Sequence, residues 1–407
     1  MNNEGMPNPS ILIIEHGESF GGAIVSIGQT VKYFQKVKPV FITFMDPAVS
    51  HQWTQNIETL CLKNHFSYKQ RQAFNHILYK YIRIKPLCRL AQQLFSLISL
   101  INDKLLARRI AHYSKLKEIA LVHSNNGISP LAYRVAKLLN TPLTYHLRGP
   151  GWHNHYSPAV LAAAEKYIFI SKFLVDQYQK NMGLAEDKFL LLYDPIDPGE
   201  IIHQTPASII NARKQMHAKP QDVVYLIAAR IIPFKGQLEF IQLCIPLLKA
   251  HAHFKIALMG DSADENQDYF DSIKCIIAQY NLEQQIVLLG FKTNPVPFIS
   301  AADVIVHFSL GPEGFGRSIA EAWGASKPII ATAIGGPIEF IHHAKDGYLV
   351  NPDNPDECRH AIQDLLLNKT LRDELGREGN LRSQELFLPE KCAQTLEQAF
   401  LEIIAQQ

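Results

Sequence analysis

Two carboxylates, Glu313 and Glu321, enclose a glycine-rich stretch in the second half of the chain. Three glycines lie just before and between them: Gly311, Gly314 and Gly316. Glycine lets the backbone approach a ligand closely, and the helix expected behind these glycines presents an N-terminus that favours an anion. The stretch therefore predicts a site for an anionic ligand, bordered by two acids.

Two cations follow an earlier apolar run, at 223–229. Arg230 comes directly after this run, and Lys235 lies where the next helix is expected to begin. Arg317 holds the corresponding position at the glycine-rich stretch. A cation at the positive end of a helix dipole is unfavourable by about 0.3–1 kcal/mol. A diphosphate bound by Arg230, Lys235 and the backbone N–H groups of 314–317 would offset this cost.

Each of these residues also has a purely structural interpretation. Ser318 and Glu321 match a capping box, in which Glu321 would only bond the start of its own helix. Glu313 could be an ordinary loop carboxylate, and the cations could be solvated in exposed loops. Spacing alone leaves both interpretations open.

The elements that must position these residues alternate along the chain. Short apolar runs, typical of buried parallel strands, are followed by helical patterns, which predicts α/β domains. Strands are expected at 11–14, 39–44, 119–123, 142–146, 167–170 and 189–193, and then at 223–229, 254–259, 286–290, 303–308, 328–332 and 347–350. Helices are expected near 23–34, 127–139, 171–182, 236–250, 266–280, 317–325, 337–343 and 355–368. The last should begin with Asn354 as its N-cap and Pro355 in its first turn.

The length of 407 residues favours two domains. Two prolines and a glycine interrupt the pattern at 193–199, which indicates a crossover between domains. We expect an N-terminal Rossmann-like domain at 1–197, a second Rossmann-like domain at 198–385, and a C-terminal helix at 386–407 that packs back toward the first domain.

Composition excludes several classes of protein. Hydrophobic residues make up 47% of the chain and charged residues 19%, which is typical of a globular protein and argues against disorder. The six cysteines show no metal-ligand spacing, so we expect reduced cysteines in a cytoplasmic protein. The polar N-terminus predicts no secretory signal, and no apolar run is long enough to span a membrane.

Residues 62–117 differ from the rest of the chain. Their pattern is mostly helical, and Asp103 is the only acid among twelve Lys and Arg residues. Aromatic and apolar residues are interleaved, so an anionic membrane surface is one candidate partner for this segment. A solvated basic face on packed helices is a second interpretation, and an RNA-binding face a third, although no nucleic-acid-binding module accompanies it.

The glycine-rich stretch and several other segments of the chain resemble a known family. The segment from Glu313 to Glu321 resembles the E-x7-E signature of retaining glycosyltransferases of the GT-B type, family 4. The resemblance continues through 322–332, Gly335-Gly336, Glu339 and 346–350, and upstream through Arg230, Pro233, Lys235, Gly236 and Gly290-Phe291. The N-terminal half is similar more loosely, through Gly21-Gly22, His146, Ser171 and 194–197.

The resemblance implies a fold and a set of roles. Two doubly wound Rossmann-like domains would face each other across a cleft, and a nucleotide-diphosphate sugar would be the donor. Arg230 and Lys235 would hold the diphosphate, Glu321 the ribose, and Glu313 the transferred sugar. The remaining donor contacts would come from Gly21, Gly22, His146, Phe291, Gly314, Phe315, Gly316 and Arg317. Neither a metal nor another cofactor is implied, and the chain contains no Asp-x-Asp motif.

The basic segment at 62–117 suggests an acceptor, a lipid-linked or membrane-surface glycan that this segment would dock. Arg148 and 152–156 are candidate contacts on the acceptor side, and no nucleic acid is expected as a partner. Two other functions stay open. The first keeps the fold but catalyses epimerisation of a sugar nucleotide, or phosphorolysis, for which we see no pyridoxal-phosphate lysine site. The second is a catalytically silent scaffold that binds the sugar nucleotide at a membrane.

Overall fold

The computed structural model describes most of the chain. The described residues are 8–17, 21–50, 53–54, 56–64, 70, 74–75, 78, 85–149, 156–202, 204–262 and 266–407. The chain divides into two compact units. Unit 1 comprises Met1–Phe169, Val175–Leu192 and Ala393–Gln407, and unit 2 comprises Ile170–Leu174 and Tyr193–Cys392.

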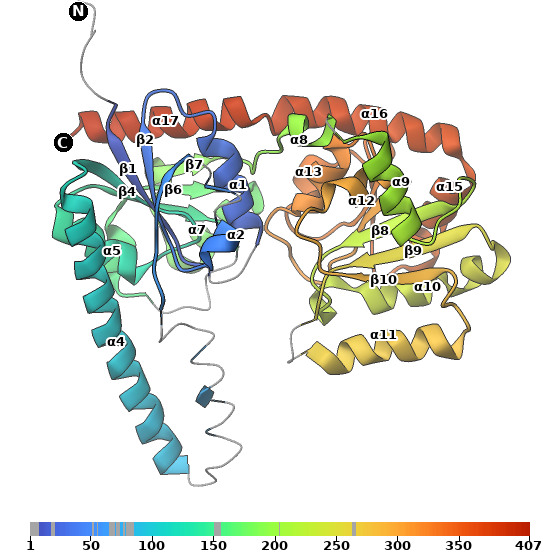
Figure 1. Ribbon diagram of the computed structural model, residues 1–407, viewed down its shortest axis with the longest axis horizontal. Coiled ribbons are helices and arrows are strands. Elements are labelled where there is room, and N and C mark those ends of the chain that lie inside the picture. The colour runs from blue at the N-terminus through green and yellow to red at the C-terminus, as the bar shows by residue number, and fades with distance from the viewer. Residues whose placement is uncertain are drawn as a thin grey trace, which may run out of the picture. The chain divides into compact units, whose positions relative to one another are not determined.

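Unit 1 is built on a parallel sheet in the order β3-β2-β1-β4-β5-β6-β7 (Figure 1). Its strands are β1 (Ser10–Glu15), β2 (Lys38–Thr43), β3 (Glu58–Cys61), β4 (Ile119–Ser124), β5 (Leu143–Leu147), β6 (Ala164–Phe169) and β7 (Phe189–Leu191). Its helices are α1 (Gly22–Val31), α2 (Pro47–Ser50), α4 (Lys85–Lys115), α5 (Pro130–Leu139), α6 (Pro158–Ala162), most of α7 (Lys172–Met182), η1 (Glu186–Lys188) and the end of α17 (Pro389–Ala405). The apolar run from Ile11 to Ile14 is fully buried, as expected for a central strand.

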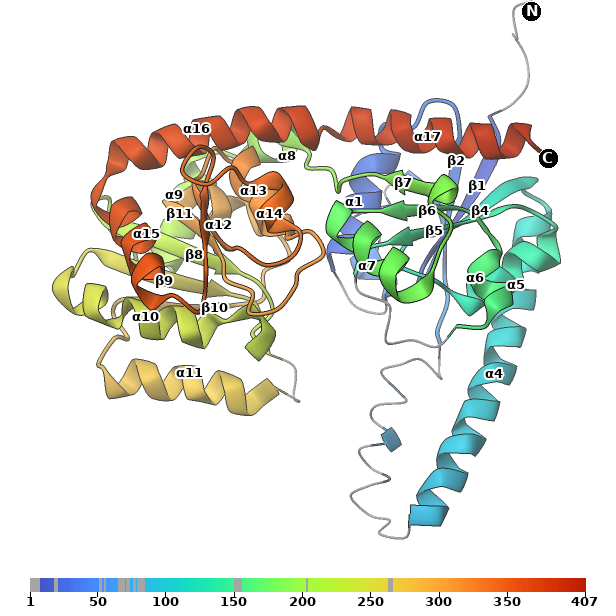
Figure 2. The same cartoon turned by 180° about the vertical axis from the view of Figure 1, so that it is seen from behind.

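Unit 2 repeats this architecture with the sheet order β10-β9-β8-β11-β12-β13 (Figure 2). Its strands are β8 (Val223–Ala228), β9 (Phe254–Met259), β10 (Ile286–Gly290), β11 (Val304–His307), β12 (Ile329–Thr332) and β13 (Tyr348–Val350). Its helices are α8 (Pro198–Ile202), α9 (Pro206–Gln215), η2 (Pro233–Lys235), α10 (Gln237–Ala250), α11 (Gln267–Gln279), α12 (Val296–Ala301), α13 (Arg317–Gly324), α14 (Pro337–Phe340), α15 (Pro355–Leu367) and α16 (Lys369–Leu386). The sequence-based prediction of two doubly wound Rossmann-like domains is confirmed.

Each sheet has one point where the strand order reverses. In unit 1 the chain winds outward from β1 and then returns to β4, which pairs with β1 on its other side. In unit 2 the corresponding neighbours are β8 and β11. The loops that leave such neighbours run to opposite faces of the sheet, so they open a crevice at the carboxyl ends of the strands. These two crevices are where a ligand is expected.

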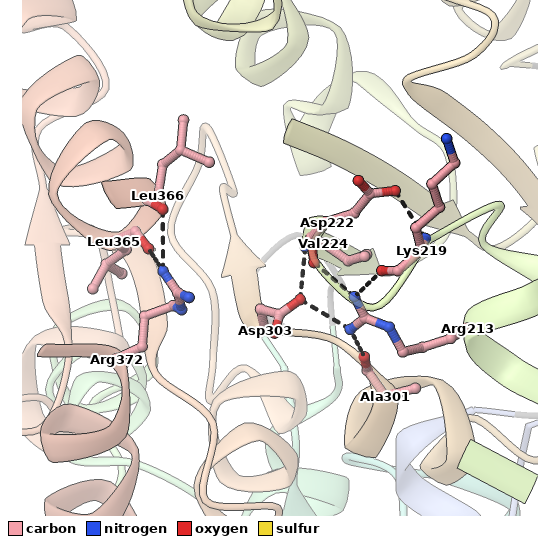
Figure 3. Close-up of polar contacts among 9 residues, drawn as sticks. All are labelled: Arg213, Lys219, Asp222, Val224, Ala301, Asp303, Leu365, Leu366 and Arg372. Carbon is pink, nitrogen blue, oxygen red and sulfur yellow. Dashed lines mark hydrogen bonds and ion pairs between the residues drawn. The ribbon is translucent and has the colours of Figure 1, made fainter. Parts of the chain in front are cut away.

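Arg213 and Asp303 hold together the opposite end of the β8–β11 pair (Figure 3). Arg213 donates to a carboxylate oxygen of Asp303 at 3.1 Å and to the carbonyl oxygen of Ala301 at 3.0 Å. The same carboxylate accepts the backbone N–H of Val224 in β8 at 2.8 Å. Figure 3 also shows Arg372, which donates to the last carbonyl oxygens of α15. The charge-assisted bonds of Arg213 and Asp303 fix the start of β8 and of β11. They thereby fix the register of the two strands at their carboxyl ends, where the candidate site lies.

Sequence patterns located most elements within a few residues. Asn354 caps α15 through a bond from the backbone N–H of Glu357, and Pro355 stands in the first turn, which confirms that prediction. Strand β3 was missed, because one exposed and three half-buried residues at a sheet edge show no apolar run. The basic segment at 62–117 contains one long helix, α4, from Lys85; residues 65–69, 71–73, 76–77 and 79–84 lie outside the described part of the chain.

Candidate functional site

Lys235 and Glu313 meet at the switch point of unit 2. Lys235 ends η2, the short turn after β8, and Glu313 lies in the loop after β11, so different strands deliver the two side chains. The ammonium group of Lys235 forms an ion pair with the carboxylate of Glu313. Both side chains are mostly buried, at 17% and 22% exposed. The structure thus brings together two residues that lie 78 positions apart in the sequence.

Glu313 is held in its ionised form by its surroundings. Its carboxylate also accepts the Ser309 hydroxyl at 3.0 Å and lies 3.7 Å from His307 Nε2. Burial raises the pKa of Glu313, but the charge of Lys235, the His307 ring and the hydrogen bonds together outweigh it, so the pKa lies below its usual value. Burial lowers the pKa of His307 to about 4, so its contact with Glu313 is no ion pair at neutral pH.

The loops around this pair are packed backbone against backbone. Gly236, directly after Lys235, has φ +62°, and a Cβ there would lie 2.3 Å from the carbonyl oxygen of Phe308. Gly335 has φ +76°, and its Cβ would lie 2.5 Å from the carbonyl oxygen of Glu313. The backbone N–H of Gly336 donates to that same oxygen at 2.8 Å. Side chains at these positions would push the loops apart, so the glycines set the position of Glu313.

Arg230 is the exposed cation of this group. It follows β8, and its own carbonyl oxygen accepts the Gln237 side chain at 2.8 Å. Within the described part of the chain, no hydrogen bond or ion pair engages its guanidinium group, and the residue is exposed. Arg230 is therefore available to an anion, whereas Lys235 is already paired.

The capping-box interpretation of Glu321 is wrong. Helix α13 begins at Arg317 after Gly316, so Ser318 lies inside the helix and cannot be its N-cap. The Ser318 hydroxyl instead shares a hydrogen bond of 2.9 Å with His307 Nδ1. Glu321 pairs with Arg317 one turn earlier, at 3.2 Å. Both predicted acids of the site therefore carry a cationic partner.

Two aromatic candidates differ in their surroundings. Phe315 is 3% exposed and packs among Tyr193, Phe340 and Phe387, so its side chain belongs to the core of unit 2. Phe291 is 47% exposed just after β10, and its backbone N–H donates to the Asp261 carboxylate at 2.9 Å. Gly314 and Gly316 are buried beside the Glu313 loop.

Unit 1 places its candidates at the equivalent crevice. Gly21 and Gly22 are exposed at the N-terminus of α1, the helix that follows β1 along the chain. No side chain caps this helix start in the part of the chain that the structure describes, and open space lies in front of Gly21. The first N–H groups of α1 can therefore receive an anion.

His146, at the end of β5, is fixed by a buried polar network. Arg148 Nη2 lies 3.2 Å from His146 Nδ1, and its guanidinium also donates to the carbonyl and side-chain oxygens of Asn125 at 2.9 and 3.0 Å. Asn125 in turn donates its side-chain amide to Glu15, a fully buried carboxylate at the end of β1. The network links the ends of β1, β4 and β5, so it spans the switch point of this unit.

Arg148 determines where His146 carries its proton. A guanidinium group only donates hydrogen bonds, so Nδ1 of His146 must accept and Nε2 must hold the proton. Burial, then the charge of Arg148, then His123 lower the pKa of His146 well below its usual value, so the ring is neutral. Nε2 is buried, and among the described residues it has no hydrogen-bond partner. His146 therefore presents one unused donor.

Sequence reasoning missed several members of both clusters. His307 was assigned only to the strand expected at 303–308. Ser309, Glu15 and Asn125 were not predicted as site residues. A polar residue at the carboxyl end of a strand next to a switch point is the signal that could have found them. Arg148 was expected to face an acceptor but is bonded to Asn125 and His146, and 152–155 lie outside the described residues.

Glu339 and Asp346, which belong to the family-like segment, have structural partners. Glu339 accepts the backbone N–H groups of Lys172 and Phe173, both at 3.0 Å. Asp346 accepts the backbone N–H of His342 at 2.7 Å. In the described part of the chain, no three His, Cys, Asp or Glu side chains are grouped so that they could hold a metal ion. There is likewise no helix in this part that is long and apolar enough to cross a membrane.

Fold and site together define a class: an α/β protein with two Rossmann-like units. One unit has a helix N-terminus near its switch point that no described side chain caps, and the other has the exposed Arg230 beside the Lys235–Glu313 pair. Residues 208–382 match the family model described as glycosyl transferases group 1. The matched segment contains Arg230, Lys235, Glu313 and Glu321. An uncharacterized glycosyltransferase of Methanocaldococcus jannaschii is 26% identical over 209 residues, which are 51% of this chain and 52% of that protein. The chain thus spans about half the length of the curated relatives it matches.

Solved structures confirm the fold over nearly the whole chain. A glycosyltransferase of Rickettsia africae superimposes with a TM-score of 0.77 at 18% identity, covering 99% of this chain and 100% of that one. The HepE protein of Anabaena, solved in complex with UDP and glucose, gives a TM-score of 0.75 at 20% identity, covering 96% and 98%. The chain therefore has the fold class of the GT-B glycosyltransferases.

Proposed function

We propose that the protein is a glycosyltransferase that moves a sugar from a nucleotide-diphosphate sugar to an acceptor hydroxyl, with retention of the anomeric configuration. The observation that carries this proposal is the group formed by Lys235, Glu313 and the exposed Arg230 at the β8–β11 switch point. The family match over 208–382 and the UDP and glucose bound by the Anabaena protein support it.

The proximity of Lys235 and Glu313 suits the covalent structure of such a donor. In a sugar nucleotide the anomeric carbon is joined to the diphosphate through one oxygen, so the sugar and the phosphate need neighbouring protein groups. Lys235 and Arg230 would hold the diphosphate and stabilise the charge that develops on it when it leaves. Glu313, ionised and in contact with Lys235, would accept hydrogen bonds from the hydroxyls of the sugar.

The remaining site residues would orient the donor. Glu321 would accept the ribose hydroxyls, Phe291 would lie near the base, and the backbone of 314–317 would face the phosphates. We further propose that Gly21, Gly22 and His146 serve the donor, with His146 donating through Nε2. We assign no covalent nucleophile; positioning and stabilisation of the leaving group would supply most of the rate enhancement. In this proposal two fixed cations replace a divalent metal, and no cofactor takes part.

The acceptor that we propose is a surface polysaccharide, a lipopolysaccharide or another lipid-linked glycan, reached from the cytoplasmic face of a membrane. The basic segment at 62–117 supports this class, because an acceptor anchored in an anionic lipid layer requires a protein that can approach that layer. The six free cysteines are in keeping with a reducing compartment.

A transfer assay with a panel of nucleotide-diphosphate sugars tests the proposal. Lys235→Ala should lower turnover by about two orders of magnitude or more, because the leaving diphosphate loses a fixed cation in a partly buried site. Lys274→Ala removes an exposed ion pair of unit 2 instead and should leave turnover unchanged. NMR of the product should show the anomeric configuration of the donor.

Several outcomes would contradict the proposal. Near-wild-type transfer in Lys235→Ala would remove Lys235 from the mechanism, and an inverted anomer would refute retention. Conversion of the donor to an epimer without acceptor would favour the sugar-nucleotide epimerase instead. Binding of donor without any release of nucleotide, over all acceptors tried, would favour the silent scaffold.

A further inference from the structure

One face of α4 is apolar and exposed to solvent. Its members are Leu87, Leu90, Leu94, Leu97, Ile98, Ile101 and Leu105, each between 45% and 57% exposed. Their spacing of three and four residues places them on a single side of the helix over about 27 Å. Figures 1 and 2 show that this half of α4 projects well beyond the sheet of unit 1.

The rest of unit 1 is attached to the other side of the helix. Leu106, Ala107, Ile110 and Ala111 are buried in the C-terminal half of α4, where the helix packs on α5. By helical periodicity these buried positions lie opposite the exposed apolar face. The exposed apolar face therefore does not belong to the hydrophobic core of unit 1.

Cations flank this apolar face. Arg89, Lys104, Arg108, Arg109 and Lys115 are all exposed on α4, and the last four lie at the end where the helix joins unit 1. Lys104 stands one turn after Ile101, and Arg108 one turn after Leu105. Asp103 is the only acid of α4, and its carboxylate is engaged by Arg134 of α5 at 3.7 Å. The helix thus combines an apolar stripe with an uncompensated positive border.

We propose that the apolar face of α4 docks on the surface of an anionic lipid bilayer, with the helix lying in the plane of the interface. The leucine and isoleucine side chains would enter the boundary between headgroups and acyl chains, and the flanking cations would contact anionic headgroups. Its charges prevent α4 from crossing the bilayer, in agreement with the absence of a spanning helix among the described residues.

A second copy of this chain fits the same face less well. Two such helices would bring their Arg and Lys borders together, and α4 offers no free acid to neutralise them. An anionic lipid surface supplies the negative charge that these cations lack. The inference deepens the proposed function, because it names the surface on which a lipid-linked acceptor would be met.

Co-sedimentation of the full chain with vesicles tests the inference without any donor or acceptor, so its result is independent of catalysis. One set of vesicles is phosphatidylcholine alone, and the other contains about a third phosphatidylglycerol. We expect binding to the second set and little to the first. Leu94→Glu/Leu97→Glu should lower the partition coefficient by at least about tenfold, since it places charge where apolar surface would enter the lipid.

The matched control is Ile210→Glu/Leu381→Glu, which changes two apolar residues of unit 2 that are 68% and 56% exposed. It should bind vesicles as the wild type does. Arg108→Glu/Arg109→Glu should abolish the preference for anionic vesicles. Because all of these side chains are exposed, each variant should keep the wild-type thermal midpoint, which is measured alongside.

Three results would overturn the inference. The first is no binding of the wild type to anionic vesicles. The second is equal loss of binding in Leu94→Glu/Leu97→Glu and in the unit 2 control. The third is a dimer in sedimentation velocity that Leu94→Glu/Leu97→Glu dissociates while vesicles are not bound, which would assign the face to a second copy.

Discussion

At the scale of single residues, the candidate site is a set of carboxylates that already hold cations. Glu313 pairs with Lys235, and Glu321 pairs with Arg317. A diphosphate would compete with Glu313 for Lys235, so the donor must offer Glu313 other partners in return. The hydroxyl groups of a sugar are such partners, because an ionised carboxylate only accepts hydrogen bonds.

Glu321→Gln tests the role of the second acid. If Glu321 holds the ribose, the variant should bind UDP about tenfold more weakly, since a charged acceptor is replaced by a neutral one. It should bind inorganic pyrophosphate as the wild type does, because pyrophosphate has no ribose. Calorimetric titration of both ligands measures this.

The Glu321→Gln variant also breaks the i,i+4 ion pair with Arg317, whose side chains are mostly buried, so its thermal midpoint is measured alongside. Glu378→Gln, which loses an exposed contact with Arg377, is the control. A parallel loss of UDP and pyrophosphate binding would show that Glu321 acts on the phosphates through Arg317, and not on the ribose.

The residues of the site were predictable to different degrees. Arg230, Lys235, Glu313 and Glu321 stand at loop positions where charge and glycine spacing indicate an anion site. Their pairing was not predictable, because it depends on which strands are neighbours. The partners of His146 were missed for the same reason: Arg148, Asn125 and Glu15 meet only once β1, β4 and β5 lie side by side.

At the scale of elements, both sheets carry histidines in or just after their strands, of which His123, His146 and His307 are buried and His16 is half-buried. His16 follows β1, His123 and His146 lie in β4 and β5, and His307 ends β11. Burial lowers the pKa of His16 and of His307 to about 4, and that of His123 to about 3. In each case the folded state resists protonation, while the unfolded state binds a proton near pH 6.5.

This difference predicts a pH dependence of stability. Because the folded pKa is lower, each histidine contributes stability that is fully present above pH 6.5 and is lost as the pH falls toward the folded pKa. The slope is about 1.4 kcal/mol per pH unit for each histidine. The raised pKa values of Asp103, Glu339 and Asp346, caused by burial, act in the opposite direction and partly offset it.

Urea unfolding of His307→Gln between pH 7 and pH 5 isolates one histidine. The variant should show a pH slope smaller than that of the wild type by about one proton. His360→Gln, which replaces an exposed histidine of α15, is the control. An identical slope in the wild type and His307→Gln would mean that His307 is protonated equally in both states, contrary to its burial.

Element boundaries followed from local signals, and the exceptions have physical reasons. Asn354 and Pro355 marked the start of α15 because a cap and a proline act within one turn. The Ser318-to-Glu321 pattern was misleading, because the positive φ of Gly316 lets the helix begin earlier. The apolar residues interleaved in 62–117 were visible in the sequence, but only the structure shows that those of one face of α4 are exposed.

At the scale of the whole molecule, alternating strands and helices predicted two Rossmann-like units. Each unit contains a parallel sheet in which the strand order reverses once. Arg230, Lys235 and Glu313 follow the two strands that meet at the reversal in unit 2. The sequence of a single strand cannot show its neighbours, so the strand order came only with the structure. The central claim is that the reversal in unit 2 is a site for a nucleoside diphosphate.

Binding of UDP, GDP and ADP to the full chain, by calorimetric titration, tests this claim most directly. Arg230→Ala is the informative variant, since this exposed guanidinium has no hydrogen bond or ion pair among the described residues and its removal should leave the fold intact. We predict that one nucleoside diphosphate binds and that Arg230→Ala weakens it about 10- to 100-fold, while Arg377→Ala, on the exposed side of α16, does not. Equal affinity in wild type and Arg230→Ala, or no binding of any nucleoside diphosphate, would contradict the account.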